Sequence, residues 1–212
     1  MLGGRLAPLR LLGVDPTASR WPMLTSEIGE LTIRPPLMAD FAAWSSLRAE
    51  SRTFLAPWEP LWPEDDLSRT SFRRRIRRYQ AEIDGDDAYP FFVFRTADHT
   101  LLGGLTLGNV RRGAAQTACL GYWMGAAHAG KGIMGQAVNA VCRLGFHKLR
   151  LERIEAACLE DNAVSIRLLE KAGFQREGLA RSYLNIAGQR QDHLLFALLA
   201  PDGRLPRDTN QR

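Results

Sequence analysis

Apolar and polar positions follow regular spacings between residues 30 and 200, and this pattern predicts a series of short strands and helices. Residues 31–34 alternate with the period typical of a strand, whereas apolar residues at 38, 41, 42, 44 and 47 recur at helical spacing. We expect helices at about 38–51, 66–83, 134–148 and 163–172, and strands at about 31–34, 91–95, 101–109, 120–124, 154–159, 174–184 and 193–199. Such a mixture predicts an α/β (α+β) fold.

The ends of two predicted helices carry capping residues. Ser68 or a neighbouring Asp precedes the second helix, and Asn162 precedes the last one, where a side-chain oxygen can accept from a free N–H of the first turn. Gly173 follows the last helix, at the place where a left-handed residue commonly ends a helix.

The two ends of the chain differ from its body. Residues 1–29 have no sustained period and are rich in Gly and Pro, so we expect a flexible N-terminal extension, a single domain over 30–200 and a polar tail over 201–212. No apolar run approaches the roughly 20 residues that cross a membrane, and Arg5, Pro8 and Arg10 interrupt the N-terminal stretch where a signal peptide would need an apolar core. We therefore expect a cytoplasmic protein that binds no membrane.

Composition adds a question about charge and argues against a metal site. The chain has 28 basic and 23 acidic residues, a net charge of +5, and 3 of its basic residues are Lys. This balance permits a nucleic acid or a phosphorylated ligand as a partner. The arginines of 73–78 spread around their predicted helix, which favours a solvated helix, although a non-enzymatic RNA-binding protein stays an alternative. The 3 cysteines have no metal-ligand spacing, so we expect neither zinc nor a disulfide scaffold.

A glycine-rich loop between a strand and a helix is the main chemical motif. Residues 125–132 have the spacing of a phosphate-binding NTPase loop, but Gly132 replaces the Ser or Thr that would bind magnesium. Residues 130–135 fit G-x-G-x-x-G, but the acidic residue expected about 20 positions later is misplaced. The remaining interpretation is an anion site, made by the N–H groups of the loop and the helix N-terminus, with Lys131 at its rim. A plain tight turn is the structural alternative.

The order of these elements resembles that of the GNAT N-acetyltransferase superfamily, and several motifs resemble its RimJ/RimL branch, the ribosomal-protein-alanine N-acetyltransferases. The motifs closest to the RimJ type are Phe54-Leu-Ala-Pro57-Trp58-Glu59-Pro60, Gly108-Asn109-Val-Arg-Arg-Gly113, Gly130-Lys-Gly-Ile-Met134 and Tyr183-Leu-Asn-Ile-Ala-Gly188-Gln-Arg-Gln-Asp192-His193. The similarity runs from about residue 30 to 201. The loop departs from the superfamily pattern at Ala129 and Met134, although Gly-Lys-Gly-x-Met is itself RimJ-like.

This resemblance implies a GNAT fold, with a mixed sheet of about seven strands, helices on both faces and one splayed strand pair that holds the cofactor. It implies acetyl-CoA as cosubstrate, no metal, and direct attack of an amine on the thioester in a ternary complex. Asn162 would face the pantetheine arm or serve only as a helix cap. The residues that would hold acetyl-CoA through their backbone are Trp123, Met124, Gly130, Lys131, Gly132, Ile133, Met134 and Gly135.

The catalytic residues are less clearly marked. The Tyr that protonates the leaving thiolate in many relatives is Leu169 here, but Ser165 matches the Ser assigned this role in RimL relatives. It lies near a helix start, where it is alternatively a capping residue. The positions of the basic Glu in two groups of relatives are Ala157 and Leu184, so Glu59 is our candidate for an amine anchor or a base that acts through water. A protein α-amine has a pKa of about 7.7–8.0, so it needs little help to lose its proton.

The sequence therefore predicts an N-acetyltransferase that acts on a protein N-terminus with Ala or Ser first, in particular that of a ribosomal protein. Association with the ribosome would follow from such a substrate, and the enzyme would be a monomer or a homodimer. The alternative within the same chemistry is a small-molecule amine as acceptor, such as an antibiotic or a polyamine.

Overall fold

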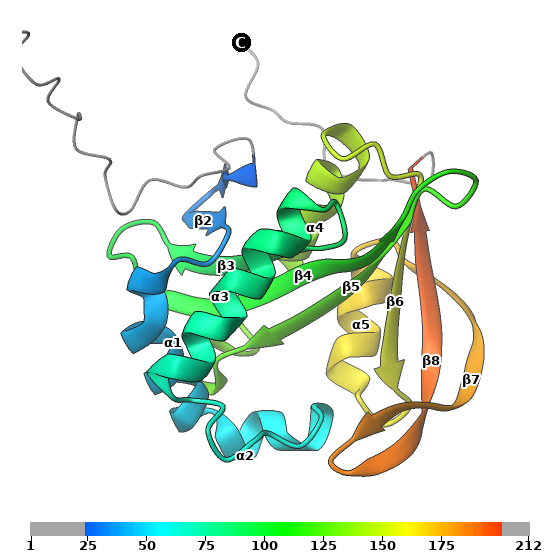
Figure 1. Cartoon of the computed structure of the whole chain (residues 1–212). Coiled ribbons are helices and arrows are strands. Elements are labelled where there is room, and N and C mark those ends of the chain that lie inside the picture. The colour runs from blue at the N-terminus through cyan, green and yellow to red at the C-terminus, as the bar shows by residue number, and fades with distance from the viewer. Residues whose placement is uncertain (1–23, 201–212) are drawn as a thin grey trace, which may run out of the picture.

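The computed structural model describes residues 24–200, and the expected polar tail and most of the expected N-terminal extension lie outside this range. One eight-stranded sheet forms the centre of the molecule, in the order β1-β2-β3-β4-β5-β6-β8-β7 (Figure 1). The strands are β1 Ser26–Ile28, β2 Leu31–Arg34, β3 Tyr89–Arg95, β4 Leu101–Arg111, β5 Thr117–Met124, β6 Arg153–Leu159, β7 Gln175–Ile186 and β8 Gln189–Leu199. The helices are α1 Phe41–Glu50, α2 Arg52–Leu55, α3 Arg69–Asp84, α4 Ile133–His147 and α5 Ala163–Lys171, with short 3₁₀ turns η2 Met38–Asp40, η3 Ala56–Trp58 and η4 Ala126–His128.

Helices cover both faces of this sheet. The larger core lies between the sheet and α4 and α5, where α4 contributes a fully buried face that includes Ala137, Val138 and Val141. The smaller core lies on the other face, where Trp44 of α1 and Phe72 of α3 pack with their rings 4.8 Å apart. Helices α1 and α3 lie over the β2–β4 half of that face and leave the β5–β8 half uncovered (Figure 1). No helix in residues 24–200 is long and apolar enough to cross a membrane.

The strands pair antiparallel throughout, except that β5 and β6 run parallel. Their shared register begins at Thr117 and Arg153 and ends at Leu120 and Ala156, although both strands continue beyond these residues. On its other side β5 stays paired with β4 as far as Met124. The two parallel strands therefore separate after Leu120, which confirms the expected splayed pair.

The predicted elements are present, and the sheet has one additional strand, β1, at its N-terminal edge. Ser68 caps α3 by accepting from the N–H of Ser71, and Gly173 follows α5 with a φ of +92°. The predicted extension over 1–29 extends too far, because Ser26–Ile28 form an edge strand and Leu24 is buried. Three residues are too short for a visible period, and this strand is held by pairing with β2. It makes the sheet one strand larger than expected.

Candidate active site

The first component of the site is the strand edge that the splayed pair leaves free. Beyond Leu120, no described strand pairs with β5 on its β6 side. The N–H of Gly125 donates to Leu102 of β4, and the carbonyl oxygen of Trp123 also lies toward β4. Because main-chain groups alternate along a strand, the N–H and C=O of Met124 face the gap, as do those of Tyr122. An unpaired strand edge offers main-chain donors and acceptors to any extended group that lies beside it. The amide-bearing arm of coenzyme A is such a group. The geometry thus fits the role expected of Met124, whereas the main chain of Trp123 faces β4 and is not free to bind the arm.

The second component is the glycine loop at the end of the same strand. Gly130 and Gly132 have φ values of +75° and +74°, which only glycine adopts without strain, and Gly132 is the residue from which α4 starts. Among the described residues, no acceptor pairs with the main-chain N–H groups of residues 130–135. A Cβ at Gly130, Gly132 or Gly135 would meet no atom within 4 Å, so the loop is open on the side where a ligand would approach. Free N–H groups at a helix N-terminus form an anion site.

Three side chains of the loop contribute differently from its backbone. Lys131 is exposed, and its Nζ donates to the carbonyl oxygen of Ala127 at 2.9 Å, so its charge stays at the rim of the loop. Met134 is buried in the large core, and Ile133 is half-buried against it. Both residues can therefore offer a ligand their main chain, while their side chains fix the helix to the sheet.

The third component lies where α5 begins, across the gap from β5. The Oδ1 of Asn162 accepts from the N–H of Ser165 at 3.1 Å, so the helix cap expected for Asn162 is present. Ser165 is half-buried and lies beside the side chain of Tyr122. These contacts place both predicted residues at the gap, and the pantetheine contact of Asn162 stays a prediction.

Tyr122 was not singled out from the sequence, yet it connects the two sides of the gap. Its hydroxyl is buried and has no hydrogen bond of full geometry among the described residues. Burial raises the pKa of Tyr122 to about 12, and the nearby Ser165 offsets only part of this shift. A phenol with such a pKa stays protonated at neutral pH and can act as a proton donor. The available signal was the position of Tyr122 two residues after buried Leu120, at the end of the strand that leads into the glycine loop.

A cavity of 390 Å³ lies on the opposite face of β5, bounded by α1, α3 and residues 59–63. Glu59 lines it, together with Trp123. Both carboxylate oxygens of Glu59 accept from the guanidinium of Arg48 at 2.7 Å, and the indole N–H of Trp62 donates to one of them at 2.7 Å. The guanidinium of Arg48 also lies over the Trp62 ring, 4.1 Å from its centre. Glu59 is therefore a carboxylate held in a fixed position.

The neighbours of Trp123 explain how its ring reaches this cavity. The ring meets Phe92 edge-on, with centroids 6.3 Å apart and an interplanar angle of 88°. It lies across Gly104, where an added Cβ would come within 2.7 Å of the indole nitrogen. A glycine is needed at this place because any side chain would push the indole away.

The outer wall of the cavity comes from two distant parts of the chain. The N–H of Ala187, in the turn between β7 and β8, donates to the carbonyl oxygen of Glu59 at 2.9 Å. In the same turn, Gly188 lies against Leu61, so that an added Cβ would come within 3.1 Å of its side chain. The β7–β8 turn thus supports the segment that presents Glu59.

The predicted residues therefore fall into two groups on either side of the β5 edge. The glycine loop, Asn162 and Ser165 border the gap between β5 and β6, and Glu59 lies in the cavity on the other face, with Trp123 beside it. Sequence reasoning missed Arg48, because nothing in the local pattern links this residue to Glu59. Among the described residues, no group of three or more His, Cys, Asp or Glu side chains is placed to hold a metal ion.

Comparisons with known proteins agree with this arrangement. A family model described as an acetyltransferase (GNAT) domain matches residues 30–175. The chain is 40% identical over 170 residues to a probable N-acetyltransferase, YjcK, of Bacillus subtilis, which covers 80% of this chain and 94% of that protein. It is 33% identical over 186 residues to a ribosomal protein uS5-alanine N-acetyltransferase of Escherichia coli, with coverages of 87% and 95%.

Solved structures give the same result. RimJ of Mycobacterium smegmatis, in complex with CoA-disulfide, has a TM-score of 0.78 and 35% identity over 84% of both chains. A ribosomal-protein-S5-alanine acetyltransferase of Vibrio fischeri has a TM-score of 0.79 and 28% identity, over 85% of this chain and 98% of that one. The free strand edge, the open glycine loop and these matches together show that the chain belongs to the GNAT acetyltransferase family and uses acetyl-CoA to acetylate an amine.

Proposed function

We propose that this enzyme acetylates the N-terminal α-amine of a protein, and that its acceptor is a ribosomal protein with Ala or Ser in first position. The observation that carries the proposal is the fixed carboxylate of Glu59, which lies in a cavity on the far side of β5 from the glycine loop. A cationic N-terminus could enter this cavity and reach the β5 edge from the side opposite the coenzyme. The uS5-alanine N-acetyltransferase named above has this class of acceptor.

Each group of residues has a task in this reaction. Acetyl-CoA supplies an activated acyl group. The N–H groups of residues 130–135 bind the anionic part of the coenzyme, and the free edge at Tyr122 and Met124 orients its arm beside β5. Ser165 and Tyr122, both at the gap, are the groups that can deliver a proton to the departing thiolate.

Glu59 suits the role of an anchor better than that of a strong base. Arg48 and Trp62 already donate three hydrogen bonds to its carboxylate, so most of its capacity to accept a proton or a hydrogen bond is in use. The remaining lone pairs can still accept from an ammonium group or from a water molecule. Because an α-amine loses its proton near pH 8, such modest assistance suffices for an N-terminal acceptor and less so for a Lys side chain.

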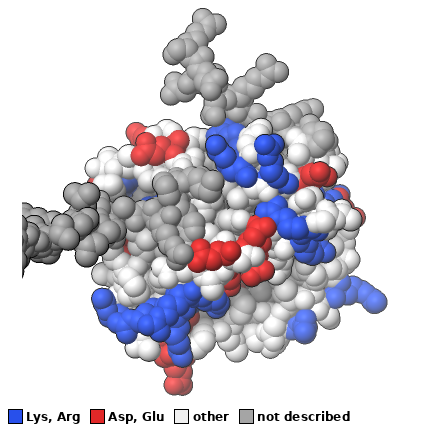
Figure 2. Space-filling view, turned by 45° about the horizontal axis from the view of Figure 1, so that its top comes forward, with Lys and Arg blue, Asp and Glu red and all other residues white. Residues whose placement is uncertain are grey.

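The charge distribution favours this proposal over an RNA-binding protein. In the helix with clustered arginines, Arg74 pairs with Asp65, Arg75 with Asp66 and Arg78 with Glu82. Figure 2 shows basic and acidic side chains in separate patches on one face of the molecule, with acidic groups at its centre. A surface that tracks a phosphate backbone needs a continuous basic stripe instead.

The test is an acetylation assay with acetyl-CoA and synthetic peptides that begin with Ala, Ser or Met, read by mass spectrometry. Matched peptides with a blocked N-terminus and an internal Lys, a polyamine and an aminoglycoside serve as controls. We expect acetylation on the α-amine of the Ala and Ser peptides. Turnover of a control amine without any turnover of free N-termini would reject the proposal.

A further inference from the structure

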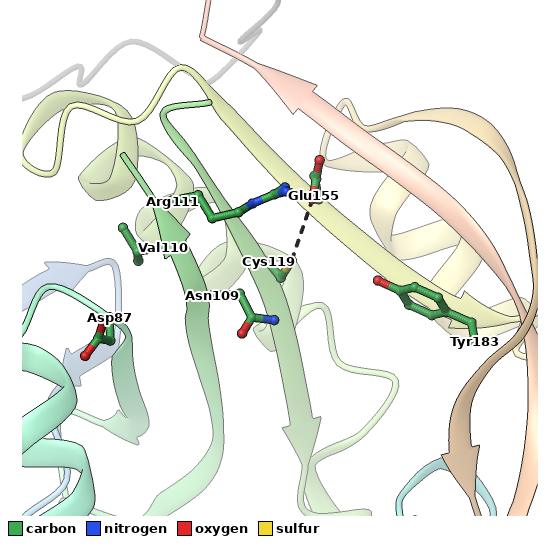
Figure 3. A pocket seen from close by; sticks show the side chains of 7 residues that line it. All are labelled: Asp87, Asn109, Val110, Arg111, Cys119, Glu155 and Tyr183. Carbon is green, nitrogen blue, oxygen red and sulfur yellow. Dashed lines mark hydrogen bonds and ion pairs between the residues drawn. The ribbon is translucent and has the colours of Figure 1, made fainter. Parts of the chain in front are cut away.

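A second cavity, of 710 Å³, lies on the same sheet face as Glu59, farther along β4 and β5 (Figure 3). Its floor consists of Asn109 on β4 and Cys119 on β5. Asp87, in the turn after α3, and Tyr183, on β7, lie at opposite ends of this floor. The proposed chemistry at the β5 edge uses none of these residues, so the cavity needs an explanation of its own.

Strand geometry places the two cavities in line. Side chains of a strand alternate between faces, so Cys119, Gly121 and Trp123 point to the same side of β5. Gly121 and Trp123 line the Glu59 cavity, and Cys119 lines the second cavity. Tyr79 of α3 borders the first cavity, and Asp87, in the turn that follows α3, borders the second.

Gly121 lies on β5 between Cys119 of the second cavity and Trp123 of the first. It is exposed, it has no positive φ, and a Cβ added there would meet no atom within 4 Å. Neither backbone conformation nor packing thus demands a glycine at this position. Any larger side chain would instead stand up from the floor between Glu59 and Cys119.

From these observations we infer that the two cavities form one groove, and that the second cavity binds the acceptor peptide beyond its first residues. This inference rests on the proposed function. From Trp123 to Cys119 the floor runs about 13 Å at ~3.3 Å per strand residue. An extended peptide with its amine at Trp123 therefore reaches the second cavity at about its fourth or fifth residue.

The charges of the second cavity indicate which side chains it accepts. The carboxylate of Glu155 is shared between Arg111, at 3.1 Å, and Arg153, at 3.0 Å. Asp87 is exposed and forms no ion pair within residues 24–200. An extra, uncompensated carboxylate at the wall favours a basic over an acidic residue at the fourth or fifth peptide position.

The first experiment varies the length of the acceptor. Peptides of two, three, four, six and eight residues, all with the same N-terminal sequence, are assayed with the unaltered protein at saturating acetyl-CoA. We expect kcat/KM to rise roughly tenfold between two and six residues and then to level off. A flat series, with short and long peptides acetylated equally well, would overturn the inference and leave the proposed function standing. Failure of every peptide would overturn both.

The second experiment obstructs the groove. The measured quantity is a ratio, kcat/KM for the six-residue peptide divided by kcat/KM for the two-residue peptide. Gly121→Val should lower this ratio to about one. Gly178→Val is the matched control, because Gly178 also lies in a strand, without a positive φ and with open space around its Cβ, but lines neither cavity. This control should keep the ratio of the unaltered protein. If Gly121→Val does not fold, as judged by circular dichroism, Gly121→Ala replaces it.

The third experiment tests Asp87. Six-residue peptides with Lys or Glu at the fifth position should differ in kcat/KM by about two- to fivefold in favour of Lys, the range expected for one exposed charge pair. Asp87→Asn should remove this preference, and raising the salt concentration should weaken it. A preference for Glu, or one that persists in Asp87→Asn, would overturn the assignment of Asp87.

The outcome that would overturn the groove comes from the second experiment. It is an equal change, in Gly121→Val and Gly178→Val, of the ratio of kcat/KM between the six-residue and the two-residue peptide.

Discussion

At the residue scale, the most informative side chain is Tyr122, because the burial of its hydroxyl lowers the stability of the fold. Its hydroxyl is buried at the gap without a full hydrogen bond among the described residues, next to Ser165. A buried polar group without a partner costs about 1–3 kcal/mol. Such a cost at a candidate active site suggests that the hydroxyl serves the bound state, in which a leaving thiolate would be its partner.

Replacing Tyr122 by Phe should therefore change stability and activity in opposite directions. Removing the unpaired hydroxyl should raise the free energy of unfolding by about 1 kcal/mol. Losing a proton donor should lower kcat at least about tenfold, with little change in the KM for acetyl-CoA. Urea unfolding and steady-state kinetics measure the two effects. An unchanged kcat would show that the phenol has no part in the chemistry.

Ser165→Ala tests whether the two hydroxyls act as one unit. We expect it to lower kcat by about tenfold or more, and the double variant with Tyr122→Phe to lose no more than the worse single variant, because groups that act together are not additive. Ser45→Ala, on the exposed side of α1, is the matched control and should leave kcat unchanged. Fully additive losses in the double variant would indicate separate roles.

The pH dependence of kcat/KM should reflect the ionisation of the acceptor amine and not that of the proton donor Tyr122. The acceptor amine must be neutral to attack, so kcat/KM should rise with pH through the α-amine pKa of about 7.7–8.0. With a pKa of about 12, Tyr122 keeps its proton up to pH 10. We therefore expect no decrease of kcat/KM at any pH lower than 10. A pH–rate profile on an Ala-initiated peptide tests this. A descending limb centred below pH 10 would assign the donor role to a more acidic group.

At the scale of single elements, local patterns predicted the parts that depend on local conformation. Gly130, Gly132 and Gly173 do adopt positive φ values, and Asn162 does cap its helix. The salt bridge of Glu59 with Arg48 depends on how α1 packs beside the following segment, and no periodicity encodes that packing. The contact of Tyr122 with Ser165 likewise depends on the separation of β5 from β6, which appears only once the sheet is assembled.

The turn into α4 offers a test of an element that serves both fold and ligand. Gly132→Ala places a side chain at a φ of +74°, which should cost about 1 kcal/mol of folding free energy and distort the N–H groups of the loop. We expect the KM for acetyl-CoA to rise about tenfold, which corresponds to a loss of ~1.4 kcal/mol in binding free energy. Gly113→Ala has a similar φ of +66° with nothing within 4 Å of its Cβ, so it should match the stability loss without the KM change. Equal KM changes in both variants would refute the anion site.

At the scale of the whole molecule, ion pairs connect segments that are distant in sequence. Arg112, just after β4, donates to both carboxylate oxygens of Asp86 and to the carbonyl oxygen of Leu149, so one side chain links three loops. The pKa of Asp86 is lowered, mainly because Arg112 donates hydrogen bonds to its carboxylate. A lowered pKa in the folded state means that the pair contributes stability above the unfolded pKa of Asp, near 3.9, and loses it as the pH falls through the folded value.

Arg112→Gln should accordingly destabilise the protein at pH 7 and much less at low pH. We expect a loss of about 1 kcal/mol at pH 7, kept small because both groups are partly exposed and screened, and a difference that shrinks as the pH falls below about 4. Thermal unfolding across pH 3–8 measures it. Arg74→Gln, which breaks a more exposed pair with Asp65, should show almost no loss at any pH. A pH-independent loss for Arg112→Gln would assign its effect to the bond with Leu149 alone.

The hydrogen bond from Ala187 to Glu59 has a consequence for the order in which the enzyme is made. The wall that presents Glu59 is supported by a turn that lies just before the last strand of the sheet. During synthesis, the segment with Glu59 leaves the ribosome long before that turn and β8 do. A partly translated chain therefore lacks a finished acceptor cavity. An enzyme whose proposed acceptors are ribosomal proteins thus acquires the means to bind them only after the β7–β8 turn of its own chain has been made.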